Sequence, residues 1–143
     1  MKRFLIYALI VVLSYFSGVL SYNTAHHLLA IPDNNEMDQL YPWVNIFFLF
    51  SALPIYFVIV LFFRLFKTRF FVINTLLKTV YLIGISLVIA AMVPYMFGGF
   101  GYLASPEFLL SEYAILLYSF FVGAALVFAI SSSIVEMYVN NKK

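Results

Sequence analysis

The 143-residue sequence contains no cysteine. This absence excludes disulfide bonds, thiolate metal sites and thiol catalysis, and it leaves the redox compartment undetermined. Charged residues are also scarce, because they make up 10% of the chain, against roughly 25% in soluble domains. The formal net charge is only +2, so the sequence lacks the strongly basic character that favours binding to nucleic acid.

Hydrophobic side chains take the place of the missing charges. They account for 65% of the residues, and aromatic side chains alone account for 20%. A soluble domain contains about 45–50% apolar residues, so this chain has too few polar side chains to cover a surface that faces water. The length allows one domain, and we therefore expect residues 1–143 to form a single membrane domain.

Four long apolar stretches predict four transmembrane helices. A bilayer core of about 30 Å requires roughly 20 apolar residues in a helix, and none of the stretches alternates with the period of a β-strand. We expect the spans to cover residues 4–25, 43–64, 72–95 and 111–136, with outer loops at 26–42 and 96–110 and an inner loop at 65–71. The predicted fold is an all-α integral membrane protein, an antiparallel bundle of four helices.

The basic residues predict the orientation of the spans. All eight gather at one end of this arrangement, provided that Lys78 extends its side chain out of the third span to the lipid headgroups; they are Lys2, Arg3, Arg64, Lys67, Arg69, Lys78, Lys142 and Lys143. The other end receives five of the six acidic residues and both histidines. Because loops rich in lysine and arginine stay in the cytoplasm, we expect a multi-pass protein of the plasma membrane with both termini cytoplasmic.

The start of the chain admits a second interpretation. Lys2 and Arg3 precede an apolar run, as in a secretory signal peptide, with residues 19–21 (Val-Leu-Ser) as the candidate cleavage site. The apolar run is longer than the usual core of a signal peptide. We therefore favour a first span that is retained.

Small residues recur at every fourth position in two of the spans. They are Ser17, Ser21 and Ala25 in the first span, and Ala125, Ala129 and Ser133 in the fourth. Positions four apart share one helix face, and small side chains let helices approach closely in lipid. We therefore predict that these two faces meet inside the bundle.

Pro54 lies in the middle of the second span. Proline has no N–H and its ring clashes with the carbonyl four residues earlier, here that of Phe50, so we expect a kink at this point. Such a kink either fits a curved bundle or serves a gate, and the sequence does not distinguish the two.

Residues 26–39 hold both histidines and three acidic residues, which raises the question of a metal or proton site. The weak candidates for metal ligands are His26, His27, Asp33, Glu36 and Asp38. Adjacent helical residues point about 100° apart, so the two histidines do not readily hold one ion, and the spacing matches no metal motif. A solvated loop rich in Asn, Asp and Pro explains the segment. We predict no catalytic, cofactor or metal site.

Ionisable residues are absent from the middle of every predicted span. Proton relays and ion-coupled transporters usually place such groups there, and no catalytic triad can be assembled within the bilayer. Glu136, the acidic residue on the inner side, can pair with Lys78, with Arg64 or with the terminal lysines. At headgroup depth we expect such a pair to contribute little, about 0–1 kcal/mol.

These features favour a non-enzymatic membrane protein that acts through contacts with a membrane or extracytoplasmic partner, in an accessory, regulatory or immunity role. The expected partners are the lipid bilayer and another membrane protein or further copies of the chain, and no nucleic acid. The alternative is a subunit of a small oligomeric transporter or channel that uses Pro54 and the serines at 131–133. A third hypothesis is an enzyme that uses His26 and His27 at the outer surface.

Overall fold

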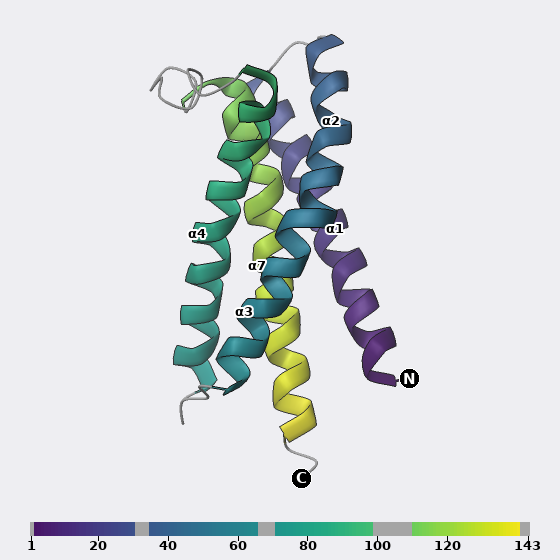
Figure 1. Ribbon diagram of the computed structural model, residues 1–143, viewed down its shortest axis with the longest axis vertical. Coiled ribbons are helices and arrows are strands. Elements are labelled where there is room, and N and C mark those ends of the chain that lie inside the picture. Colours follow the sequence, from purple (N-terminus) through teal and green to yellow (C-terminus); the bar gives the residue numbers. More distant parts are fainter. Residues whose placement is uncertain (1, 31–34, 66–70, 99–109, 141–143) are drawn as a thin grey trace.

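The computed structural model describes the backbone of residues 2–30, 35–65, 71–98 and 110–140, and the side chains of residues 4–30, 41–65, 72–93 and 110–138. Within these ranges the chain forms no strand, and its helices are α1 (Lys2–Leu29), α2 (Asn35–Phe47), η1 (Phe48–Ala52), α3 (Leu53–Leu65), α4 (Phe71–Gly98) and α7 (Glu112–Asn140). α2, η1 and α3 follow one another without a break and form one long segment (Figure 1).

Four segments are long and apolar enough to cross a membrane. They correspond to the four predicted spans and cover Phe4–Leu29, Tyr41–Leu65, Val72–Val93 and Glu112–Tyr138. The described ends of the chain, in α1 and α7, lie at the same end of the bundle (Figure 1). The prediction of an all-α protein with four transmembrane helices is confirmed, and the chain is a multi-pass membrane protein.

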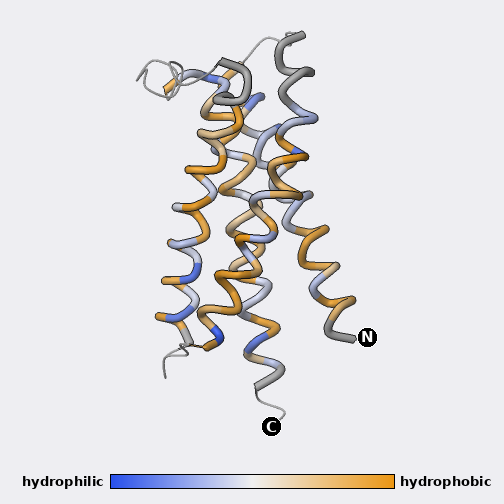
Figure 2. The backbone as a smooth tube through the Cα atoms, in the orientation of Figure 1, coloured by the Kyte–Doolittle hydropathy of each residue, from blue (hydrophilic) through white to orange (hydrophobic). Residues whose placement is uncertain are grey.

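Hydrophobic residues predominate along most of the length of the bundle, and the most hydrophilic of the described positions lie toward its two ends (Figure 2). Large hydrophobic side chains are exposed on every span, for example Phe16 in α1, Phe50 in η1 and Val80 in α4. A soluble protein rarely exposes apolar patches of this extent. Lipid chains are the solvent that suits this surface.

The helices extend into the predicted outer loops. α1 continues through both histidines to Leu29 and α2 begins at Asn35, so most of the loop predicted at 26–42 is helical instead. The sequence has no glycine or proline between Gly18 and Pro32, so no residue in this stretch interrupts the hydrogen-bond ladder. α1 ends where Ala30 adopts a φ of 50°, a conformation that commonly terminates helices.

The other helix ends lie closer to the predicted limits. α4 extends to Gly98, three residues into the loop predicted at 96–110, and α7 begins at Glu112. The Ser111 hydroxyl accepts a hydrogen bond from the Ala114 N–H at 3.2 Å and so caps the start of α7. α3 ends at Leu65 and α4 begins after residue 70, and residues 66–70 of the inner connection lie outside the described ones.

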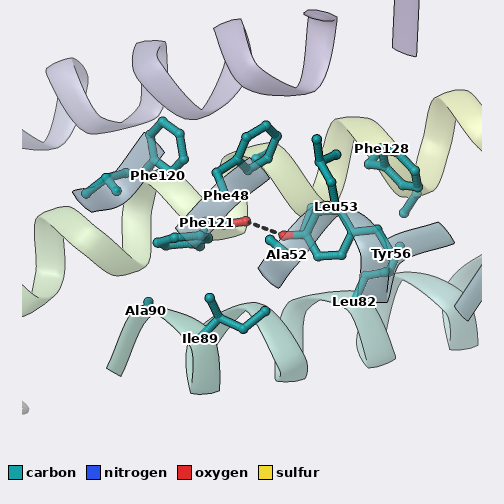
Figure 3. Packing of buried hydrophobic residues seen from close by; sticks show 14 of the residues in the cluster. Phe48, Ala52, Leu53, Tyr56, Leu82, Ile89, Ala90, Phe120, Phe121 and Phe128 are labelled. Carbon is teal, nitrogen blue, oxygen red and sulfur yellow. Dashed lines mark hydrogen bonds between the residues drawn. The ribbon is translucent and has the colours of Figure 1, made fainter. Parts of the chain in front are cut away.

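α7 is the central helix, and it packs against α1, α3 and α4 (Figure 1). Three rings on α7 are fully buried, those of Phe120, Phe121 and Phe128. The ring centroids of Phe48 and Phe120 lie 5.7 Å apart, and those of Tyr56 and Phe128 lie 5.2 Å apart (Figure 3). Ring pairs at such separations contribute about 0.5–1.5 kcal/mol beyond their area burial, so aromatic contacts hold the middle of the second span to α7.

α1 and α7 meet through small residues, as predicted. Gly18 lies against the Phe120 ring and Gly123 lies against Ser21, so a Cβ atom on either glycine would approach its neighbour to 3.0 Å or less. The Ser17 hydroxyl donates a hydrogen bond to the Gly123 carbonyl at 3.1 Å. Close approach of the two backbones is what small side chains permit in lipid.

The small residues predicted on α7 lie on a different face from this contact. Ala125, Ala129 and Ser133 are buried, and Glu136 follows three positions later on the same face. Glu136 binds Lys78 of α4, so this face is directed toward α4. The predicted pairing of this stripe with the first span was wrong, because α7 has small residues on two faces and spacing alone does not identify the neighbour of each.

Replacing Ala129 with leucine should destabilise the bundle by about 1–3 kcal/mol, because added methylene groups in a packed core displace their neighbours and Ala129 is fully buried. The control is Ile130→Leu, since the adjacent Ile130 is 49% exposed. Thermal unfolding in detergent should show a lower midpoint for A129L and an unchanged one for I130L. Equal midpoints for all three proteins would show that Ala129 is not closely packed.

The second span departs from α-helical geometry immediately before Pro54. Residues Phe48–Ala52 form a π-helical turn, in which the Leu53 N–H bonds to the Phe48 carbonyl five residues earlier. Such wide turns accommodate a proline within a span. The segment changes direction between α2 and α3 (Figure 1), so the expected kink is present and takes the form of a π turn.

Candidate functional site

Lys78 of α4 and Glu136 of α7 form an ion pair inside the bundle. Lys78 Nζ donates to Glu136 Oε2 at 3.2 Å, and the two side chains are 0% and 16% exposed. Lys78 lies seven residues after the start of α4, about 10 Å along its axis, and Glu136 lies four residues before the end of α7. The antiparallel packing of the two helices therefore brings both charges to the same depth.

Lys78 does not extend to the lipid headgroups, so the expectation of snorkelling was wrong. Its side chain is fully enclosed by protein, because the carboxylate of Glu136 is within reach on the neighbouring helix. The expectation that the pair is exposed was wrong for the same reason. Removing one partner of a buried pair costs about 3–5 kcal/mol, since the other charge stays buried without compensation.

Asn74 adds a third polar group to this end of the α4–α7 contact. It lies one turn before Lys78 on the same face of α4, and its Oδ1 atom is buried without a hydrogen-bond partner among the described residues. We call Asn74, Lys78 and Glu136 the inner polar cluster. Ionisable groups within a membrane span often mark ion or proton pathways, so this cluster is the strongest candidate for chemistry in the described part of the chain.

A second buried polar contact lies nearer the middle of the bundle. The Tyr56 hydroxyl is hydrogen-bonded to the Ser86 hydroxyl of α4. It also donates to the Phe121 carbonyl of α7 at 3.4 Å (Figure 3). Ser86 in turn donates to the Leu82 carbonyl at 2.6 Å. These bonds join three helices and hold them in register, as polar side chains commonly do between membrane helices.

The two histidines lie in the last turn of α1. Their ring centroids are 6.1 Å apart with planes at 77°. Glu36 and Asp38 lie in α2 with side chains outside the described ones, and Asp33 lies outside the described residues. Among the residues that the structure describes, no three His, Cys, Asp or Glu side chains could hold a metal ion, and metal binding by this segment stays a hypothesis.

The sequence identified part of the inner polar cluster. It gave Lys78 as one of several partners for Glu136, but it did not indicate that the pair is enclosed by protein. Tyr56 was missed, although its position offered a signal, because tyrosines in membrane proteins gather at the interfaces and Tyr56 lies well inside the span Tyr41–Leu65.

Comparisons with protein-family models, with curated proteins and with solved structures found no match.

Proposed function

We propose that the chain is a non-enzymatic membrane protein that binds a membrane or extracytoplasmic partner, in an accessory, regulatory or immunity role. The packed interior of the bundle carries this proposal. Around α7, the rings of Phe48, Tyr56, Phe120, Phe121 and Phe128 are all 0% exposed, so in the described part of a single chain the space between the spans is filled by side chains. What the protein presents to other molecules is its outer surface.

Photo-crosslinking in native membranes tests this proposal. A photoreactive amino acid is placed at one exposed position on each of three spans, Phe16, Val58 and Val80. The buried Phe120 serves as the control position. We expect one defined protein to be captured from at least one exposed position and not from Phe120. Capture of lipid alone, or of this chain alone, from all three positions would overturn the proposal.

The alternative is a subunit of a small oligomeric transporter or channel, and the inner polar cluster supports it. Ser132 and Ser133 are also buried on α7, one turn from Glu136, so several polar groups line the α4–α7 contact. Flux of ions or protons into vesicles containing the protein, lost in the Glu136→Gln variant, would support this function. Stable monomers without flux would exclude it.

We also propose that the protein resides in the plasma membrane with both termini in the cytoplasm, as the distribution of its lysines and arginines indicates. Since the chain lacks cysteine, Glu36→Cys and Lys67→Cys variants each carry one thiol. A membrane-impermeant maleimide should label position 36 in intact cells and position 67 only after permeabilisation. The cysteine-free chain is the control, and the reverse labelling pattern would invert the proposed orientation.

A further inference from the structure

The π turn before Pro54 leaves main-chain carbonyls short of donors. The Leu53 N–H is already bonded to the Phe48 carbonyl, Pro54 has no N–H, and the later N–H groups belong to the regular ladder of α3. The Ile55 N–H is then the one main-chain donor left for the carbonyls of residues 49–51. Two of these three carbonyls therefore lack a main-chain hydrogen bond.

These carbonyls lie near the middle of the span Tyr41–Leu65, where water is not at hand to satisfy them. One side of the turn faces outward, because Leu49 and Phe50 are 52% and 78% exposed and Pro54 is exposed, whereas Phe48 and Ala52 are buried on the other side. Lipid chains can cover this surface, but they have no hydrogen-bond donor to offer. An unsatisfied carbonyl in hydrocarbon is costly, so the turn favours a neighbour that brings a donor to this depth.

Ser51, in the same turn, offers such a donor. It is half-buried, and no hydrogen bond of its hydroxyl is found within the described ranges. Three other serines of the spans, Ser14, Ser86 and Ser119, each donate to the carbonyl four residues earlier. One turn of the chain therefore carries both an unused donor and unused acceptors.

We propose that this turn is the centre of a dimer contact between two copies of the chain. A two-fold axis perpendicular to the membrane places the same turn of each copy at the same depth, which a self-complementary interface requires. The Ser51 hydroxyl of each copy then donates to a carbonyl of residues 49–50 in the other. Exposed Phe50, Pro54 and Val58 supply the surrounding apolar contact. This dimer is independent of the proposed binding to a different protein.

Disulfide formation in native membranes tests the contact directly. Because the chain lacks cysteine, a Ser51→Cys variant should form an oxidised dimer through that position under a mild oxidant. The matched control is Ser119→Cys, at a serine on the exposed side of α7, which should stay monomeric. A Ser51→Cys protein that gives no dimer, or that crosslinks to a different protein, would overturn the proposal.

Energy transfer between labelled copies in lipid vesicles measures the affinity. Removing the donor with Ser51→Ala loses two symmetric hydrogen bonds and should raise the dimer Kd roughly tenfold. Pro54→Ala returns an N–H to the turn and should weaken the dimer as well, whereas Ser119→Ala should not. The same Kd for Ser51→Ala and the unchanged chain would reject this turn as the contact, and monomers at every concentration would reject the dimer. Neither outcome bears on the photo-crosslinking test of the proposed function.

Discussion

Replacing Glu136 with glutamine should lower the free energy of unfolding by about 3 kcal/mol. The Lys78 side chain is 0% exposed, so its ammonium would remain in a poorly solvated position without the carboxylate that compensates it. Glutamine has nearly the same shape as glutamate, so the loss reports the charge and not the packing. Reversible unfolding in bicelles, followed by trapping of the unfolded state, measures the difference.

Substitution of Lys78 and substitution of Glu136 should lower the free energy of unfolding by different amounts. Glu136 is 16% exposed, so after Lys78→Met its carboxylate can reach water or take up a proton, and we expect a smaller loss than for E136Q. The double variant Lys78→Met/Glu136→Gln should recover part of the stability, because neither side chain is then charged. The control is Glu112→Gln, at an exposed position, and equal stabilities of E136Q and E112Q would show that the pair contributes nothing.

Replacing Gly123 with alanine should destabilise the protein by about 1–3 kcal/mol through overpacking. The added Cβ would lie 2.7 Å from the Cβ of Ser21, which is closer than carbon atoms tolerate, and 3.1 Å from the Ser17 carbonyl oxygen, which is a tight contact. One of these neighbours is main chain and the other is a Cβ atom fixed to the main chain, so a side-chain rotation does not relieve the contact and the α1 backbone has to shift away from α7. The expected result is a lower unfolding midpoint in detergent and weaker protection of α1 from proteolysis.

Gly84→Ala is the matched control for this exchange. Gly84 is also a helical glycine within a span, but a Cβ atom there would meet nothing within 4 Å. Alanine at this position should therefore be neutral or stabilise the helix by about 0.5–1 kcal/mol. Adding Ser21→Gly to G123A should restore part of the lost stability. If G123A is as stable as G84A, and Ser21→Gly restores nothing, the tight α1–α7 contact is ruled out.

The number of spans and the helical class followed from the sequence alone, because both depend on local properties. A run of about 20 apolar residues has to cross the bilayer as a helix, whatever lies next to it. The rotation of each helix about its own axis depends on its neighbours instead. The spans are apolar on all sides, so the sequence offered little indication of which face turns inward, and the stripe of Ala125, Ala129 and Ser133 was assigned to the wrong neighbour.

The inner polar cluster was likewise predictable from the sequence only in part. Composition placed Lys78 and Glu136 toward the inner side of the third and fourth spans, but a lysine near the end of a span can either reach the headgroups or turn inward. The choice depends on whether a carboxylate lies at the same depth on an adjacent helix, and the packing of α4 against α7 supplies it.

The sequence by itself determined that the chain is a four-helix membrane protein, because the cost of placing a peptide in hydrocarbon is set residue by residue along the chain. Only the tertiary structure decided that Lys78 is enclosed by protein, that α1 packs closely against Gly123 and that a π turn precedes Pro54. These features arise from contacts between segments far apart in the sequence, where the depth and rotation of one helix fix what its neighbour can bury.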